Sequence, residues 1–132
     1  MRVLGFHHLA IQVHSLEETA AFYRRVLGLA EKQRHHREDG SLRSIWLEVP
    51  GTGGGFLALE EASGERVRDD DFRTDRAGPL LLALRIDRRD RARALEELER
   101  LGVPVVHQSR WTLYFRDPEG NRLALSHHPD DP

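Results

Sequence analysis

The sequence of 132 residues predicts an α+β fold built from two copies of one βαβββ module. A strand, a capped helix and three further strands follow one another in this order in each half. Short apolar triplets also recur at matching places: Leu9-Ala10-Ile11 corresponds to Leu82-Ala83-Leu84, and Leu57-Ala58-Leu59 corresponds to Leu123-Ala124-Leu125. One half alone is too short to bury a large core, so we expect the two modules to pair.

The first module begins with a strand and a capped helix within residues 6–28. Side chains alternate along a strand, so this one has an apolar face for helix packing and a mixed face that carries His8. Ser15 stands where an N-cap is expected, and Glu18 three residues later completes a capping box. Gly28 can adopt the left-handed conformation that ends a helix.

Three strands are expected next in the first module, at residues 29–36, 42–49 and 56–61. The same alternation assigns one face of the last two strands to the helix and leaves the other face open. The side chains expected on the open face are Ser44, Trp46, Glu48, Phe56, Ala58 and Glu60. Residues 50–55 are rich in glycine but lack the lysine and the following helix of a phosphate-binding loop, so we interpret them as a turn.

The second module follows a polar stretch at residues 61–79, whose three aspartates at 69–71 are typical of a solvated surface segment. We expect a strand at 80–87, a helix from Asp87 to Leu101 capped by Asp87, and strands at 103–106, 112–116 and 122–126. The sequence Asp117-Pro118-Glu119-Gly120-Asn121 is a strong turn signal. We divide the chain into a first module (1–62), a linker (63–79), a second module (80–128) and a tail (129–132), which together form one structural domain.

Composition excludes several classes of function. The formal net charge is −2, so there is no electrostatic case for nucleic acid or for an anionic membrane surface as a partner. No apolar run approaches the roughly 20 residues of a membrane span, and no secretory signal is visible at the start. The chain has no cysteine, which excludes disulfides, thiolate metal sites and cysteine nucleophiles. A cytoplasmic protein is the expectation.

Two motifs point to a family. The segment His8–Val13 with the following Phe22-Tyr23 and Leu27-Gly28, and the later segment Tyr114–Asn121, resemble the vicinal oxygen chelate superfamily. That superfamily includes glyoxalase I, extradiol dioxygenases, epimerases, fosfomycin resistance proteins and bleomycin resistance proteins. The resemblance covers nearly the whole chain. It implies that the two modules form a curved mixed sheet around a cleft.

The same resemblance implies where a metal ion would bind. Metal-dependent members carry a ligand on the first and last strands of each module, and these positions fall on His8, Ala58, Leu81 and Ala124. Only His8 has a donor atom, and one imidazole cannot hold a divalent ion by itself. A displaced centre that uses Glu60, Ser126 or His128 would need a rearranged site, because two residues of strand span roughly 6.6 Å.

The paired histidines are not an obvious substitute for the missing ligands. The pairs are His7-His8, His35-His36 and His127-His128. Adjacent residues of a strand point to opposite faces, so we expect that neither member of a pair can share an ion with the other. For His8 we therefore favour a cavity-lining role over a metal-ligating one.

The residues expected to contact a ligand share the open faces of the two sheets. They are His8, Trp46, Glu48, Phe56, Glu60, Arg85, Tyr114, Arg116 and Arg122. The aromatic rings would stack on a ligand, and the arginines would either clamp an anion or pair with the two glutamates. His8, Glu48 and Glu60 are the catalytic candidates, although both carboxylates could simply face solvent. Trp111 is assigned to the core by its alternation with Leu113 and Phe115.

The leading hypothesis is a metal-free protein that binds or sequesters a small organic ligand, similar to the bleomycin resistance branch, with no cofactor. A homodimer is implied by the same resemblance. The alternative is a metal-dependent lyase, isomerase or dioxygenase of the glyoxalase I type with a shifted centre, or a metal-free enzyme that uses His8 with Glu48 or Glu60. A third possibility is a partner-binding module that docks through the linker.

Overall fold

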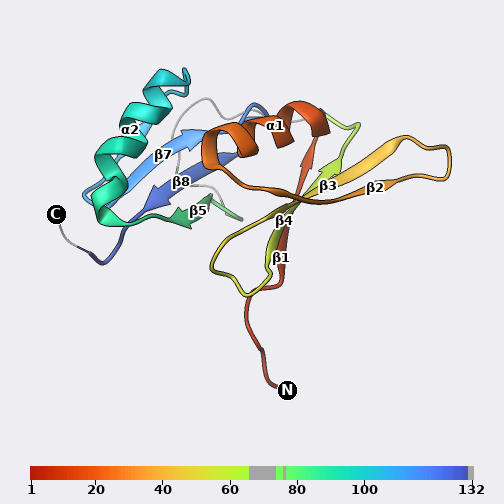
Figure 1. Ribbon diagram of the computed structural model, residues 1–132, viewed down its shortest axis with the longest axis horizontal. Coiled ribbons are helices and arrows are strands. Elements are labelled where there is room, and N and C mark those ends of the chain that lie inside the picture. The colour runs from red at the N-terminus through yellow and green to blue at the C-terminus, as the bar shows by residue number, and fades with distance from the viewer. Residues whose placement is uncertain (66–73, 76, 131–132) are drawn as a thin grey trace. The chain divides into compact units, whose positions relative to one another are not determined.

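The computed structural model describes residues 1–65, 74–75 and 77–130. The chain divides into two compact units, Met1–Glu65 and Arg66–Pro132 (Figure 1). The predicted linker begins in the first unit. Its residues 66–73 and 76, which include the three aspartates, lie outside the described part. So do residues 131 and 132 of the predicted tail. Within the described residues neither helix has the length and apolar run needed to cross a membrane.

The first unit contains one helix and four strands. They are β1 (His8–Val13), α1 (Leu16–Leu27), β2 (Glu31–His36), β3 (Leu42–Glu48) and β4 (Phe56–Glu61). The strands form a mixed sheet in the order β1-β4-β3-β2, in which β1 is parallel to β4 and the other pairs are antiparallel. Helix α1 lies across one face of this sheet (Figure 1).

The second unit repeats the design. Its elements are β5 (Leu82–Arg85), a short 3-10 helix η1 (Arg88–Asp90), α2 (Arg91–Arg100), β6 (His107–Gln108), β7 (Thr112–Arg116) and β8 (Arg122–Ser126). The strand order β5-β8-β7-β6 is that of the first sheet, again with only the first pair parallel.

Strand register confirms the duplication. In the first sheet Leu9-Ala10-Ile11 lies opposite Leu57-Ala58-Leu59. In the second, Leu82-Ala83-Leu84 lies opposite Leu123-Ala124-Leu125. The four triplets that match in the sequence thus occupy the same places in two sheets of the same topology. The predicted α+β fold with two repeated modules is confirmed.

The core of the first unit lies between α1 and the sheet. Ile45 and Leu47 on β3 and Leu57 and Leu59 on β4 are at most 1% exposed, as alternation predicted for the helix-facing side. Each such side chain stabilises the fold by about 1.5–3 kcal/mol relative to full exposure. Burying this face fixes the register, because a slip of one residue would turn every apolar side chain away from α1.

Helix α1 begins and ends at the predicted residues. The Ser15 hydroxyl accepts a hydrogen bond from the Glu18 backbone N–H at 3.3 Å. At the other end Gly28 has a φ of 67°, and its N–H donates to the carbonyl of Arg24. Both ends of the helix are therefore set by local sequence signals.

Substituting Ser15 with alanine is expected to lower the free energy of unfolding by about 1 kcal/mol, because the helix loses a cap acceptor. Urea denaturation followed by circular dichroism measures the change. Ser15→Asp is the matched control, since it restores an acceptor and places a negative charge at the helix N-terminus. Equal losses in the two variants would contradict a capping role.

An exposed ion-pair group joins α1 to the sheet. The Arg34 guanidinium on β2 donates to the carboxylates of Glu17 on α1 and of Glu31. The bond that Arg34 donates to Glu17 lowers the pKa of Glu17 below its ordinary value. Because the group is exposed, it contributes little stability, on the order of 0.5 kcal/mol. It does show that Glu31 and Arg34 both lie on the side of α1, because the irregular pairing between Glu31 and Gln33 breaks the alternation of β2.

The second module differs from the prediction at its boundaries. Strand β5 is shorter than the predicted 80–87, and α2 starts at Arg91 after the 3-10 turn. Asp87 caps η1 and not α2: its carboxylate accepts from the Arg89 N–H at 2.9 Å, and Arg89 lowers the pKa of Asp87 to about 2. The strand predicted at 103–106 is wrong: β6 is His107–Gln108, and its pairing starts where the Val106 N–H donates to Tyr114. Pro104 has no N–H to offer a ladder.

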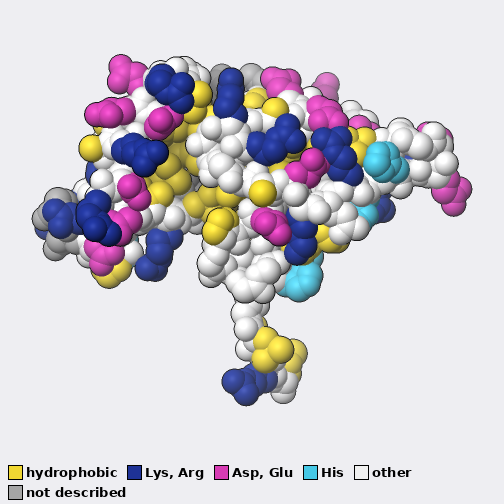
Figure 2. Space-filling model, viewed as in Figure 1, with side chains coloured by type: hydrophobic (Ala, Val, Ile, Leu, Met, Phe, Trp, Pro, Cys, Tyr) yellow, Lys and Arg dark blue, Asp and Glu magenta, His cyan; other side chains and the backbone are white. Residues whose placement is uncertain are grey.

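The first six residues form an extended arm that precedes β1 (Figure 2). Its apolar side chains are exposed, with Leu4 at 89% and Phe6 at 55%. Phe6 lies beside the β3–β4 loop, close to Gly55. A Cβ at Gly55 would come within 2.5 Å of the Thr52 hydroxyl, so a side chain there would force this turn to rearrange.

Candidate functional site

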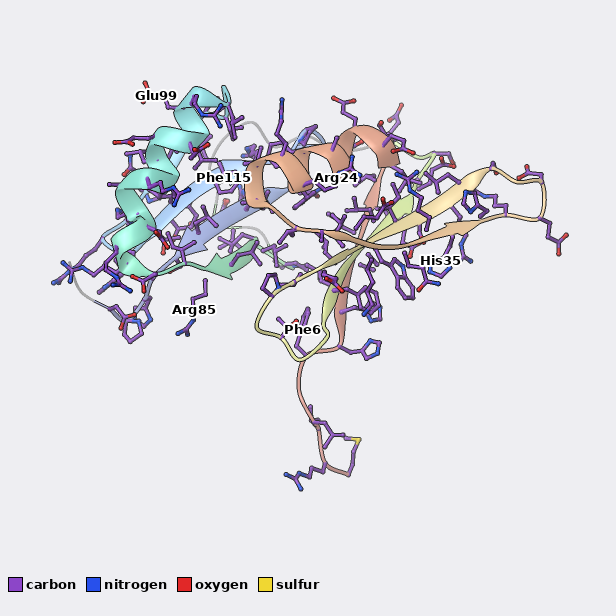
Figure 3. The ribbon with its side chains drawn as sticks, in the orientation of Figure 1. Phe6, Arg24, His35, Arg85, Glu99 and Phe115 are labelled. Carbon is purple, nitrogen blue, oxygen red and sulfur yellow. The ribbon has the colours of Figure 1, made fainter. Side chains whose placement is uncertain are left out.

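The face of the first sheet opposite α1, called the open face below, carries most of the predicted site residues. Its side chains are His8, Ala10, Gln12, Gln33, His35, Ser44, Trp46, Glu48, Phe56, Ala58 and Glu60. Alternation along β1, β3 and β4 placed nine of these correctly by parity. Figure 3 labels His35 on β2 of this face and Arg24 on α1.

Four aromatic side chains of the open face form a continuous row, the ring column, with one ring from each strand. His8 stacks on Phe56 with centroids 4.9 Å apart and an interplanar angle of 6°. Phe56 stacks on Trp46 at 4.3 Å and 21°, and the Trp46 ring meets the His35 ring at 4.4 Å. These separations lie near the lower end of the range that aromatic pairs favour. The column therefore holds Trp46 in place from both sides.

Polar atoms inside the open face lack hydrogen-bond partners. Among the described residues, the Ser44 hydroxyl, the Trp46 Nε1 and the His35 Nε2 are all buried and all unpaired. They are neighbours, because Ser44 lies opposite His35 in the ladder and the Trp46 ring touches the His35 ring. A buried polar group without a partner costs about 1–3 kcal/mol, so three together are unusual for a surface that has only a packing role.

His7 and His8 correct the expectation that adjacent histidines point apart. Their Nδ1 atoms are 2.8 Å apart, and both rings contact Phe56. The reason is that β1 begins at His8, so His7 lies outside the strand and its side chain does not alternate. The pair shares a hydrogen bond, in which one Nδ1–H donates to the other Nδ1.

The catalytic candidates are not brought together by the register. His8 lies opposite Phe56, whereas Glu60 lies opposite Gln12, four residues along and thus roughly 13 Å from His8. Glu48 also pairs with Phe56, but on β3, about 9.6 Å from β1. His8 therefore has the His7 and Phe56 rings as neighbours. A catalytic base formed by His8 with Glu48 or Glu60 stays a prediction, and this register does not favour it.

In the second unit, the predicted residues also share the face opposite the helix-side core. Tyr114, Arg116 and Arg122 alternate with the buried Leu113 and Phe115 of β7 and with Leu123 and Leu125 of β8. Arg116 donates to the Gly120 carbonyl, and Tyr114 meets the ring of His107 at 5.3 Å. Arg85 is exposed on β5. This face has a tyrosine and three arginines, but its described residues form no ring column.

Two residues near this sheet differ from expectation. Trp111 is half-buried rather than part of the core, and its ring meets the ring of His128 at 5.0 Å. It precedes β7, which begins at Thr112, so the alternation used to place it does not extend that far. His127 is the buried member of its pair, at 1% exposure, and its Nδ1 lies 2.6 Å from the Asp130 carbonyl.

The residues present do not fit the metal ion of the family's metal-dependent members. Ala58 lies between Ala10 and Trp46 in the ladder and offers no donor, and Leu81 and Ala124 offer none either. Among the described residues no group of three histidine, aspartate or glutamate side chains is placed to hold an ion. Ser126 is hydrogen-bonded to Thr112 and His128 packs on Trp111, so neither replaces a missing ligand.

Three contributors to the open face were not singled out by sequence reasoning. His35 joins the ring column, Ser44 supplies a buried hydroxyl, and the Lys32 ammonium lies 5.0 Å from the Phe56 centroid while it donates to Gly54. Alternation with Trp46 had placed Ser44 on this face but did not indicate that its hydroxyl is buried. His35 lies opposite Ser44 in a regular stretch of the ladder, whereas Lys32 lies at the irregular pairing between Glu31 and Gln33, which the sequence does not reveal.

The fold is shared with several solved structures. A glyoxalase/dioxygenase from Nostoc punctiforme is 20% identical with a TM-score of 0.77, covering 96% of this chain and 92% of that one. The fosfomycin resistance protein FosX from Listeria monocytogenes is 18% identical with a TM-score of 0.72, covering 96% and 92%. An integron cassette protein from the mobile metagenome of the Halifax Harbour sewage outfall is 21% identical with a TM-score of 0.72, covering 95% and 99%. These identities support a shared fold only.

A comparison with curated proteins finds no match. A family model does match, over residues 5–125, which is most of the chain and includes both modules. That range contains the His8–Val13 strand and the Asp117–Asn121 turn from which the family was expected. The chain belongs to the glyoxalase/bleomycin resistance protein/dioxygenase superfamily.

Proposed function

We propose that this protein binds a small organic ligand on the open face of its first sheet and does so without a metal ion. One observation carries the proposal: the Ser44 hydroxyl, the Trp46 Nε1 and the His35 Nε2 form a buried group of polar atoms without described partners. A ligand that displaces the side chains covering them and offers hydrogen-bonding atoms would satisfy them and recover the free energy lost by their burial. The ring column beside them supplies the apolar surface that small-molecule sites require.

The missing ligands support the metal-free part of the proposal. Three of the four positions where family members bind metal hold alanine or leucine, and His8 is engaged with His7 and Phe56. We therefore expect protein purified without a histidine tag to contain far less than one metal ion per chain. Elemental analysis, followed by titration with Ni²⁺, Mn²⁺, Zn²⁺ and Fe²⁺, measures this. Stoichiometric metal that disappears in His8→Ala would overturn the metal-free reading.

The binding test uses two buried hydroxyls that both lack described partners. Ser44 is on the open face, whereas Thr19 is on α1 in the helix-facing core, and both are fully buried. A library of organic fragments is screened by ligand-observed NMR against the wild type, Ser44→Ala, Trp46→Phe and Thr19→Val. Fragments should bind the wild type and Thr19→Val alike and bind Ser44→Ala and Trp46→Phe less tightly, by about 5- to 10-fold for one lost hydrogen bond.

The control separates loss of binding from loss of structure. Thr19→Val removes an unpaired buried hydroxyl with little change of shape, as Ser44→Ala does on the other side of the sheet. Neither change should lower stability much, because the hydroxyl removed had no partner. Fragments that bind all four proteins equally, or a library from which nothing binds, would refute a ligand site on the open face.

A metal-dependent enzyme with a shifted centre is the second candidate, favoured by the convergence of His7 and His8. Two nitrogen ligands of one tetrahedral ion lie about 3.3 Å apart, and the Nδ1 atoms are separated by 2.8 Å. Two imidazoles are nevertheless only half of a tetrahedral set, and the described residues supply no third. The metal titration above distinguishes this candidate from the first.

A further inference from the structure

The ring column has a regular spacing that follows the sheet. Its rings come from β1, β4, β3 and β2 in their order across the sheet, at centroid separations of 4.9, 4.3 and 4.4 Å. Neighbouring strands are about 4.8 Å apart. The rings therefore stand beside one another as the strands do: His8, Phe56 and Trp46 are stacked face to face, and His35 is tilted by 52° against Trp46.

Phe56, the second ring of the column, has no free face. Phe56 lies on β4 between β1 and β3, so His8 covers it from one side and Trp46 from the other. The phenyl ring is accordingly only 5% exposed. A ligand cannot stack on Phe56 without displacing a neighbour.

Within the described residues of the first unit, the column ends at the outer face of His8. β1 is the edge strand of its sheet, with β4 as its neighbour on one side, and His8 is exposed. His7 does not occupy this end. Its centroid is 5.0 Å from His8 and 5.6 Å from Phe56, which are themselves 4.9 Å apart. Three nearly equal distances place His7 beside the stacked pair rather than beyond His8.

The residue after His8 on the same face leaves space along the strand. Ala10 is exposed and extends only a methyl group, and the next side chain on that face is Gln12. From His8 to Gln12 the strand rises roughly 13 Å. A flat group wider than one ring can therefore lie against His8 without meeting a larger side chain of β1.

We propose that the outer face of His8 is a stacking site for a planar aromatic compound, large enough for two fused rings, which adds a fifth ring to the column. This inference goes beyond the proposed function, because the fifth ring lies about three strand spacings, roughly 14 Å, from the polar atoms of Ser44 and Trp46 on β3. Ring stacking on an aromatic side chain adds to affinity beyond the area that it buries. A saturated compound of the same size and charge lacks the flat π face and gains none of this.

The test compares flat and saturated partners of equal charge. The probes are naphthalene-2-carboxylate, 2-naphthylmethanol and 2-(aminomethyl)naphthalene, each with its decahydronaphthalene counterpart, so anionic, neutral and cationic compounds are all represented. Dissociation constants are measured by ligand-observed NMR. At least one flat probe is expected to bind about 2- to 12-fold more tightly than its saturated counterpart, the range typical of aromatic pairs.

Variants at His8 assign the preference to stacking. His8→Leu places there the residue found at the matching position of the second module, and it should abolish the preference for flat probes. His8→Phe keeps a ring and should retain it. His36→Leu is the matched control, an exposed histidine at the end of β2 outside the column, and should leave the preference unchanged.

The outcomes separate this inference from the proposed function. If no flat probe binds, if flat and saturated probes bind equally, or if the preference survives His8→Leu, the inference is overturned. Probes or library fragments that show no flat preference but lose affinity in Ser44→Ala leave the open-face site intact and remove only the stacking claim. The occupant of this place could instead be an aromatic ring of a second copy of the chain. The protein would then form a concentration-dependent dimer, which His8→Leu would dissociate and flat probes would compete with. That result also overturns the inference.

Discussion

Replacing Phe56 with alanine should lower the free energy of unfolding by about 3–5 kcal/mol and disorder the ring column. Phe56 is 5% exposed, and its two faces are covered by His8 and Trp46. The Lys32 ammonium lies 5.0 Å from its centroid as well. Removing the ring leaves a cavity and takes away the support of Trp46 on one side. Since whole domains are stable by about 5–15 kcal/mol, this one change removes a large share of the stability.

Phe56→Leu separates packing from stacking in this experiment. Leucine restores much of the lost volume but has no ring, so its cost should fall to about 1–2 kcal/mol while the aromatic contacts remain broken. Urea denaturation gives the stabilities, and near-ultraviolet circular dichroism reports on the environment of Trp46. A loss below about 1 kcal/mol in Phe56→Ala would mean that the ring is not packed as the stacking geometry indicates.

The backbone design of both modules could be predicted because its signals are local. Alternation along β3 and β4 separates Ile45 and Leu47 from Trp46, and the structure buries the first two completely. Ser15 and Gly28 similarly specify where α1 starts and stops. Each of these signals depends on residues within one turn of helix or one strand, so no knowledge of distant contacts is needed.

The contacts of the site could be predicted only in part, because they depend on pairing between distant strands. Parity placed His8 and Phe56 on one face, but the parallel register that puts them opposite each other joins residues 48 positions apart. The convergence of His7 on His8 depends on the start of β1, a boundary that no pattern determines. His35 reaches Trp46 because the antiparallel register of β2 with β3 puts it opposite Ser44, two residues from Trp46 on the same face.

Three polar atoms illustrate the same limit from another direction. Ser44, Trp46 and His35 are ordinary strand residues in the sequence, and only the structure shows that their polar atoms are buried without described partners. Whether a side chain is satisfied depends on everything that surrounds it, which a one-dimensional pattern does not contain. The absence of metal-ligand side chains at positions 58, 81 and 124, in contrast, is visible in the sequence alone.

The second large effect is expected from Leu59→Ala, which should lower the free energy of unfolding by about 2–5 kcal/mol. Leu59 is fully buried on the helix-facing side of β4, opposite Ile11 on one neighbouring strand and Ile45 on the other. By strand alternation its side chain lies on the opposite side of the sheet from the ring column and the unpaired polar atoms. The variant should therefore be less stable, yet bind open-face ligands with unchanged affinity at temperatures where it stays folded.

Two further substitutions control this result. Val106→Ala shortens an apolar side chain that is 44% exposed and should change stability by less than about 0.5 kcal/mol. Leu125→Ala tests the residue that holds the register position of Leu59 in the second sheet, opposite Leu84 and Leu113. Leu125 is 8% exposed, so its loss should cost somewhat less than that of Leu59. If Leu59→Ala were as mild as Val106→Ala, the helix-facing side of β4 would not be a packed core, and the separation of a structural face from a binding face would fail with it.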